Sequence, residues 1–358
     1  MQLVQARVVG LGPLHDLTFP FADDAGVPRK VVIVLGGGGV GKTTLVGAIA
    51  NTRPGHAVAL KPRRASQPAF AVVDWSVAAE DPPRPHPLRV ASPNALLGDS
   101  DDAALLRRRE QALFDRRAAE GGFALGVFSA ARWFSRTPIL LGGGDRRLVR
   151  HDLHSGPALE DASRADITRE TKEMLSYPIV SAAVSRTSPW ISRFRPRSEE
   201  ARAQAESLEN AVRGAVEPLA NVTGYGYVGV EPATFEPVFE RGPGGPLCAF
   251  DELPTQTRHL VALAALTVRT LHAASPGADA RLAEGVALVD DADAHLETAA
   301  RRALVPALRE ALPNVQWILA TSSPDLALPC EAGAVLALRR LPESEEVRLY
   351  EGDLAVVH

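Results

Sequence analysis

The sequence predicts an α/β fold built around a mixed, mostly parallel sheet. The segment Val31–Leu35 is apolar on both faces, as expected of a buried central strand. Four glycines follow it and a helix begins at Lys42, so strand, glycine-rich loop and helix occur in direct succession. From about residue 225, apolar strands alternate with helical segments, which is typical of a parallel sheet covered by helices. The 358 residues are enough for one large α/β domain with insertions.

Further elements are predicted in the first half of the chain. Strand-like segments lie at 3–9, 17–21, 56–60, 69–78 and 123–128. The helix that follows the glycines continues to about Asn51, and residues 103–120 predict another helix.

The middle of the chain contains the clearest helix signal. Ser198 is a suitable N-cap, and the spacing of the apolar residues that follow it places them in one stripe on one helix face. These residues are Ala201, Ala205, Leu208, Val212, Ala215 and Leu219. The stripe is too short for a long coiled-coil arm, so it indicates a helical subdomain packed on the core.

The last third of the chain predicts the rest of the α/β core. Phe250–Leu253 leads into a helix over about 255–273, and a second helix is expected over 295–311. A buried strand is expected at 285–290, and further strands are expected at 316–320, 334–338 and 347–350.

Composition narrows the class of protein. Hydrophobic residues make up 46% of the chain, which is enough for a sizeable core and excludes global disorder. The net charge of −4 disfavours a protein that coats DNA without sequence preference. Cys248 and Cys330 provide neither a disulfide framework nor metal-ligand spacing. With no signal peptide and no apolar run of membrane-spanning length, we expect a soluble, cytoplasmic protein with no membrane contact.

The glycine-rich loop matches the Walker A motif completely. The matching residues are Gly36, Gly37, Gly38, Gly39, Val40, Gly41, Lys42 and Thr43, with Thr44 next in the helix. Glycines allow backbone N–H groups to turn inward around a β-phosphate, and the helix N-terminus adds positive potential. We expect Lys42, one of four lysines, to reach the β- and γ-phosphates, and the Thr43 hydroxyl to bind Mg²⁺. The sequence therefore predicts ATP binding.

A Walker A loop needs an acidic side chain from another strand to hold Mg²⁺, and an acidic pair after a later strand can supply it. In Leu288-Val289-Asp290-Asp291, we expect Asp290 to hold Mg²⁺ from a neighbouring strand. Asp291 is the candidate base that polarises the attacking water. The alternative is that residues 290–293 form only a polar loop at the end of a strand.

The acidic pair belongs to a longer segment, residues 288–297, with the sequence Leu-Val-Asp-Asp-Ala-Asp-Ala-His-Leu-Glu. This segment resembles the Walker B and D-loop block of ABC-type ATPases. The resemblance is closest to the branch that contains SMC, RecF and OLD-like proteins. Residues 2–21 are similar to the opening β-hairpin of that branch, and 250–260 lie where its signature motif belongs. Residues 318–326 resemble its strand and H-loop after Walker B. The resemblance implies a P-loop NTPase fold with an N-terminal antiparallel β subdomain and a helical insertion.

The resemblance also implies a head-to-tail homodimer that sandwiches two ATP molecules. Each ATP would lie between the Walker A loop of one subunit and the 253–258 segment of the other, where Thr255 could supply the signature hydroxyl. Several positions depart from the family pattern. Gln256 replaces a glycine, Asp291 is shorter than the usual glutamate, Ser322 replaces the switch histidine, and no glutamine follows strand 123–128 as a Q-loop ligand. We therefore expect secure nucleotide binding and slow hydrolysis.

These expectations describe one ABC-type ATPase domain over residues 1–358. It would comprise a Walker A half with the β subdomain (1–150), a helical insertion (151–224) and a signature and Walker B half (225–358). The expected function is that of a slow ATPase switch, with a protein partner, in a bacterial DNA-repair or phage-defence complex. The alternative is an ATP-binding scaffold that does not hydrolyse ATP and stabilises an assembly.

Three other features allow two interpretations each. His295 could contact the opposite active site of a dimer or simply precede a surface helix. His151 and His154 have the spacing of two metal ligands, but no third ligand lies nearby. Arginines at 186, 193, 195 and 197 alternate with Trp190 and Phe194, and a second cluster lies at 107–109 and 116–117. Such arginines could bind nucleic acid or belong to solvated surfaces.

Overall fold

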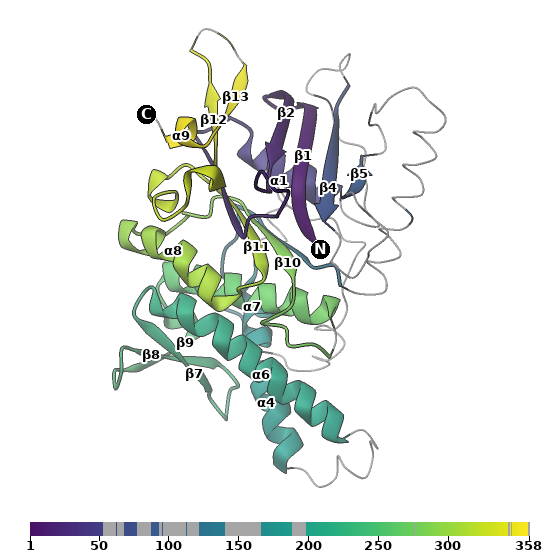
Figure 1. The fold of residues 1–358 in the computed structure, drawn as a ribbon. Coiled ribbons are helices and arrows are strands. Elements are labelled where there is room, and N and C mark those ends of the chain that lie inside the picture. The colour runs from purple at the N-terminus through teal and green to yellow at the C-terminus, as the bar shows by residue number, and fades with distance from the viewer. Residues whose placement is uncertain are drawn as a thin grey trace.

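Six strands form the central sheet of the computed structural model (Figure 1). In sheet order they are β13 (Val347–Glu351), β12 (Val335–Arg340), β3 (Val31–Gly36), β11 (Val315–Thr321), β10 (Gly285–Val289) and β6 (Leu125–Phe128). Every pair is parallel except β12 with β13. The structure describes residues 1–52, 62, 68–76, 87–92, 95, 112, 122–139, 166–187, 198–275, 277–342, 344 and 346–356.

The central strands are apolar on both faces because each face covers a separate hydrophobic core. In β3, Val31 and Ile33 belong to the core on the helical side, whereas Val32 and Val34 belong to the opposite core. The side chains of β10 and β11 divide between the same two cores. This arrangement explains why these strands have continuous apolar sequences and no polar alternation.

An antiparallel sheet and one helix form the layer on one side. The sheet order is β2 (Leu14–Pro20), β1 (Gln2–Leu11), β4 (Phe70–Ser76) and β5 (Leu88–Ala91), and α1 (Lys42–Asn51) contributes to the same core. Gln316 on β11 joins the two sheets at a buried point. Its amide accepts a 2.7 Å hydrogen bond from the Leu3 backbone N–H and donates a 2.9 Å bond to the Leu3 carbonyl.

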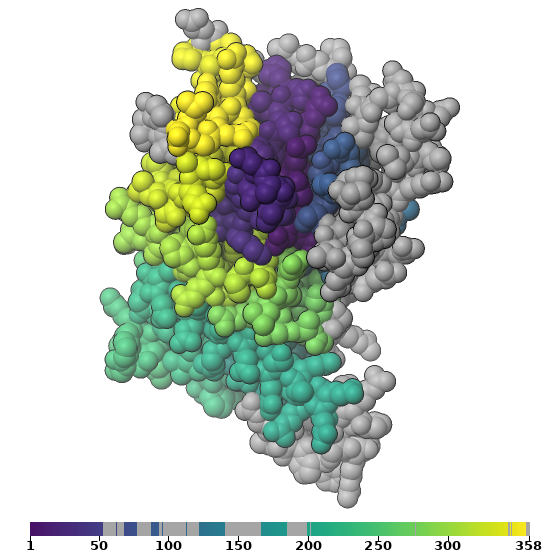
Figure 2. Space-filling view, viewed as in Figure 1, coloured from purple at the N-terminus to yellow at the C-terminus, as the bar shows by residue number. Residues whose placement is uncertain are grey.

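Helices form the layer on the other side. They are α4 (Thr168–Thr187), α6 (Ser198–Asn221), α7 (Thr255–Ala274) and α8 (Thr298–Ala311). The predicted stripe of α6 is confirmed from Ala205 to Leu219, because these apolar side chains are buried against α7 and α8. Figure 2 shows the N-terminal strands beside the C-terminal segment in one half of the molecule and α6 in the other.

A three-stranded antiparallel sheet lies beside these helices and was not predicted. It consists of β7 (Tyr225–Val230), β8 (Pro237–Arg241) and β9 (Leu247–Ala249). Tyr227 and Phe239 of this sheet are buried in the main core, and Tyr225 and Cys248 pack against it while partly exposed, so the sequence of the sheet lacks the apolar runs of the central strands. Three 3₁₀ turns (Phe250–Glu252, Pro324–Leu326, Ala332–Ala334) and α9 (Asp353–Val356) complete the described elements.

A buried lysine joins α4 to the segment before α7. The Lys172 ammonium lies 2.7 Å from an Asp251 carboxylate oxygen and 3.0 Å from one of Glu236, and it donates to the Thr137 carbonyl. The Lys172 side chain is 1% exposed, so its charge depends on these partners. The contact fixes the entry of the chain into α7.

The predicted α/β fold class is confirmed, with both the mostly parallel sheet and the N-terminal antiparallel sheet. The predicted strand 56–60 lies outside the described residues, and so does the predicted helix 103–120 except for residue 112. Helix α8 begins at Thr298 and not at 295, because residues 290–295 form turns. Within the described residues, no helix combines the length and the apolar character that crossing a membrane requires.

Candidate functional site

The Walker A residues form a loop between β3 and α1, at the carboxyl edge of the central sheet. Gly39 (φ 72°) and Gly41 (φ 100°) adopt left-handed conformations that favour glycine. A Cβ on Gly41 would lie 2.8 Å from the Leu14 side chain, so this glycine is also required by its close contact with β2. By contrast, a Cβ on Gly37 or Gly38 would meet no atom within 4 Å, so the tip of the loop is open.

Lys42 lies folded along the inside of this loop. Its ammonium donates to the carbonyls of Gly36 (2.8 Å) and Gly37 (2.9 Å), and the residue is 8% exposed. These carbonyls are at the base of the loop, so the charge is held where the motif requires it for phosphate binding. On the outer side of the loop, Arg340 of β12 donates to the Gly39 carbonyl at 2.9 Å.

Thr43 and Asp290 are brought together although they are 247 residues apart in the sequence. The Thr43 hydroxyl donates a 2.7 Å hydrogen bond to Asp290 Oδ2. From the sequence, Asp290 was expected on a strand neighbouring β3. This is wrong in one respect, because β11 lies between β3 and β10. The side chains still meet because parallel strands end at the same edge of the sheet.

The environment of Asp290 suits a cation. The residue is 1% exposed, and its Oδ1 atom is buried with no hydrogen-bond partner within the described residues. Burial raises the pKa of the Asp290 carboxyl, while the hydrogen bond from Thr43 lowers it. A buried carboxylate oxygen with no partner, beside a hydroxyl, is the hard-oxygen chemistry that Mg²⁺ prefers. The residues present therefore fit a magnesium ion.

Asp291 follows in a left-handed conformation with φ 43°. Aspartate tolerates this region better than most residues, although at some cost in energy. Its carbonyl accepts the Ala294 backbone N–H at 2.9 Å, and the next amide, of Ala292, donates to the Ala320 carbonyl at 2.8 Å. The acidic pair thus belongs to an ordered turn at the end of β10.

Arg132, which the sequence analysis did not single out, holds this turn from the side of β6. Its guanidinium donates to the carbonyls of Asp290 (2.7 Å), Asp291 (2.8 Å) and Ser129 (2.8 Å). The residue is 5% exposed. Burial lowers the pKa of Arg132, and the nearby carboxylates, Asp290 first, oppose that shift. The only local signal was an arginine after a buried strand in an arginine-rich chain.

Thr255 lies apart from this constellation, at the first turn of α7. It is exposed, and its hydroxyl accepts a 3.3 Å hydrogen bond from Arg258. The side chain of the neighbouring Thr257 is buried and bonded to Thr223 at 2.9 Å. The structure therefore leaves Thr255 accessible at the start of the helix.

His295 belongs to the turn before α8 and is exposed, with φ 64°. Its ring stacks on the ring of His259 in α7, with centroids 4.7 Å apart and planes 6° from parallel. His259 is buried, and Phe134 packs edge-on against it at 4.9 Å. Burial above all, then the charges of Arg132, His295 and Arg258, lowers the pKa of His259 to about 3. His259 is therefore neutral at ordinary pH.

The segment expected to resemble the H-loop is also ordered by hydrogen bonds. The Thr321 hydroxyl donates to an Asp293 carboxylate oxygen and accepts the Ser323 backbone N–H. Ser322, which the resemblance places where the family has its switch histidine, is exposed. These contacts link the end of β11 to the turn that carries the acidic pair.

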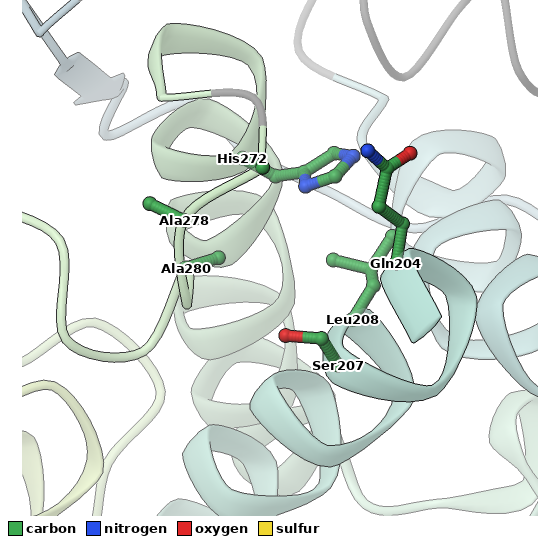
Figure 3. A pocket seen from close by; sticks show the side chains of 7 residues that line it. Gln204, Ser207, Leu208, His272, Ala278 and Ala280 are labelled. Carbon is green, nitrogen blue, oxygen red and sulfur yellow. The ribbon is translucent and has the colours of Figure 1, made fainter. Parts of the chain in front are cut away.

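Most of the remaining candidates lie in parts of the chain that the structure does not describe. His151, His154, residues 188–197 and both arginine groups at 107–109 and 116–117 lie outside the described residues. Among the described residues, no group of three or more His, Cys, Asp or Glu side chains could hold a metal ion. A pocket between α6 and α7, lined by Gln204, Ser207 and His272 among others, is shown in Figure 3. Its free volume of about 20 Å³ admits roughly one water molecule, so it is not a nucleotide site.

Comparisons with known proteins give matches only in structure. No protein-family model matches the chain, and no curated protein sequence matches it. The SMC head domain from Thermotoga maritima matches at 13% identity and a TM-score of 0.48, over 99% of this chain and 100% of that one. A Smc head domain with an extended coiled coil, bound to the C-terminal domain of ScpA derived from Pyrococcus furiosus, matches at 11% identity, 98% and 96% coverage and a TM-score of 0.48.

A third solved structure gives the more informative match. It is an Smc head bound to the C-winged helix domain of ScpA, and it matches at 12% identity and a TM-score of 0.51, over 99% of both chains. At this identity the likeness shows the fold alone. Together with the strand–loop–helix order at residues 31–51 and the strand order around it, the match shows that this chain has the fold of the ABC-type P-loop ATPases.

Proposed function

We propose that this chain binds ATP with Mg²⁺ and hydrolyses it slowly, as the switch subunit of a larger complex. The observation that carries the proposal is the 2.7 Å hydrogen bond between Thr43 and Asp290. It joins the Walker A helix to the acidic pair without any residue between them. In nucleotide-bound P-loop ATPases, a hydroxyl and a carboxylate in these roles share the metal ion.

Each residue then has a defined task. The loop Gly36–Gly41 receives the phosphates with its backbone N–H groups, and Lys42 places a positive charge beside them. Thr43 and Asp290 would hold Mg²⁺, which when bound neutralises phosphate charge. Asp291 orients and deprotonates the attacking water. Because its side chain is one methylene shorter than glutamate, the water lies farther from its base and hydrolysis is slow.

The site is incomplete for fast hydrolysis within one chain. Thr255 is exposed at the start of α7 and is hydrogen-bonded to Arg258, with no hydrogen bond to the Walker A loop among the described residues. We propose that Thr255 faces the ATP held by a second copy, in a head-to-tail dimer that closes while the γ-phosphate is present. ATP then acts as a switch, because it stabilises only the closed state.

The output of this switch passes to other molecules. The matched Smc head is bound to a domain of ScpA, and we propose by analogy that a protein partner binds this chain. A bacterial DNA-repair or phage-defence complex is the setting that we propose, with DNA as a second ligand. Added duplex DNA should then change the ATPase rate, and an unchanged rate and gel mobility would remove the DNA role.

Steady-state hydrolysis by matched variants tests the enzymatic proposal. Lys42→Ala should abolish both ATP binding and turnover, whereas Asp291→Asn should reduce turnover to a small residual rate and retain binding. Lys30→Ala and Asp24→Asn change exposed residues of the same types that precede β3, whereas the site follows that strand, and they should leave both unchanged. Tight ATP binding without turnover in the wild type would instead support a scaffold that uses ATP only to stabilise an assembly.

A further inference from the structure

We propose that Arg132 is a positioning residue that fixes the backbone of the acidic pair and thereby sets the reactive conformation of Asp291. This inference rests on the proposed function, since it concerns how the candidate base is held. It adds a residue that lies outside the Walker motifs, in the loop that follows β6.

The contacts of Arg132 converge on the two residues that matter. One guanidinium nitrogen donates to the Asp290 carbonyl at 2.7 Å and the other donates to the Asp291 carbonyl at 2.8 Å. The first nitrogen also donates to Ser129 at 2.8 Å, which anchors the side chain to its own loop. A planar guanidinium can span two successive carbonyls, whereas a lysine ammonium provides one point of charge. The Arg132 guanidinium therefore links the loop after β6 to the end of β10 through hydrogen bonds to two successive carbonyls.

These hydrogen bonds matter because Asp291 has an uncommon backbone conformation. A non-glycine residue with φ 43° persists only where surrounding contacts hold it. On the following side, the Ala292 N–H is bonded to Ala320, and the Ala294 N–H is bonded to the Asp291 carbonyl. Arg132 binds that same carbonyl from the loop that follows β6. It thus limits rotation of the peptide that carries the candidate base.

The burial of Arg132 makes the restraint firm. The residue is 5% exposed and lies close to the carboxylates of Asp290, Asp291 and Asp293, which favour its charged form. A buried, charged donor exchanges few of its hydrogen bonds with water, so the carbonyls it binds are held in one orientation.

Arg132→Lys is the central test, because it keeps the positive charge and removes the planar guanidinium that spans the two carbonyls. We expect kcat to fall by about tenfold or more, since small misplacements of a catalytic group are costly, while ATP affinity stays close to wild type. Hydrogen exchange at the Ala294 amide, which is bonded to the Asp291 carbonyl, should accelerate. Arg281→Lys is the matched control, because Arg281 also donates to two backbone carbonyls, those of Glu310 and Ala311, but it precedes β10, whereas the acidic pair follows that strand.

A double variant separates positioning from general stability. With Asp291→Asn already present, Arg132→Lys should lower the residual rate no further, although it should still accelerate exchange at Ala294. An equal loss of rate in both backgrounds would overturn the proposal, as would a similar loss in Arg281→Lys. If the wild type does not hydrolyse ATP, the proposed function fails, and the exchange measurement decides on Arg132 alone. Unchanged exchange at Ala294 then overturns its positioning role.

Discussion

At the residue scale, the decisive contact joins Thr43 to Asp290. Both residues were predicted from motifs, because the Walker A pattern specifies its threonine and an acidic residue after a buried strand specifies its partner. Arg132 and Arg340 were not predicted. Their roles depend on backbone carbonyls 158 and 301 residues away. Every residue has such a carbonyl, so the sequence does not indicate which one an arginine will bind. Side-chain motifs are therefore visible in the sequence, and side-chain-to-backbone supports are not.

Replacing Thr43 by valine should remove the magnesium dependence of nucleotide binding. The variant keeps the shape of the side chain but loses the hydroxyl that is bonded to Asp290. In the wild type, titration with a fluorescent ATP analogue should show much weaker binding in EDTA than in Mg²⁺. In Thr43→Val the two curves should nearly coincide, and Thr43→Ser should restore the difference. A full magnesium effect in Thr43→Val would show that Thr43 does not hold the metal.

The buried His259 should make folding stability sensitive to mild acid. Its pKa is lowered from 6.5 to about 3 in the folded protein. As pH falls below 6.5, the unfolded chain takes up a proton that the folded protein does not, so stability is lost progressively until the folded pKa is reached. Between about pH 7.5 and about pH 5, wild type should lose roughly 2 kcal/mol more stability than His259→Gln.

Urea denaturation at a series of pH values measures this difference. His15→Gln, a change at an exposed histidine, should leave the pH dependence of the wild type intact. Parallel curves for wild type and His259→Gln would show that His259 accepts its proton in the folded protein.

At the element scale, prediction succeeded where apolar patterning was strong. The central strands β3, β10 and β11 and the helices α6 and α7 were predicted because burial on both faces or along one stripe dictates their sequences. The sheet of β7, β8 and β9 was missed because most of its residues are only partly buried. Helix α4 was missed as a separate element because its apolar residues are interrupted by charged ones and by Pro178.

Lys172 should contribute strongly to the joining of these elements. Removing its charge leaves the carboxylates of Glu236 and Asp251 together without their partner, at side-chain exposures of 21% and 23%. We expect Lys172→Met to lower the free energy of unfolding by about 3 kcal/mol, near the lower end for a broken buried pair. Removing Arg202, which pairs with Glu206 on the surface of α6, should cost less than about 0.5 kcal/mol. Equal effects of the two changes in chemical denaturation would contradict this account of Lys172.

At the scale of the whole molecule, one sheet separates two cores and carries the site at its edge. The core with β1 and α1 supports the phosphate loop, and the core with α6, α7 and α8 supports the acidic pair and Thr255. The mostly parallel sheet could be predicted because apolar strands and helices alternate in the second half of the sequence, whereas the antiparallel sheet was expected from the family resemblance. The sequence could not predict how the layers meet, since contacts such as Gln316 with Leu3 join residues 313 positions apart.

The central claim is that each chain holds Mg-ATP in a half-site that a second copy completes. Its most direct test is the initial rate of ATP hydrolysis, per protein molecule, measured at saturating ATP over a wide range of protein concentration. The account predicts a specific activity that rises with protein concentration and then levels off, with Thr255→Ala remaining near the low value throughout. A specific activity that is already full at the lowest concentration and unaffected by Thr255→Ala would contradict it.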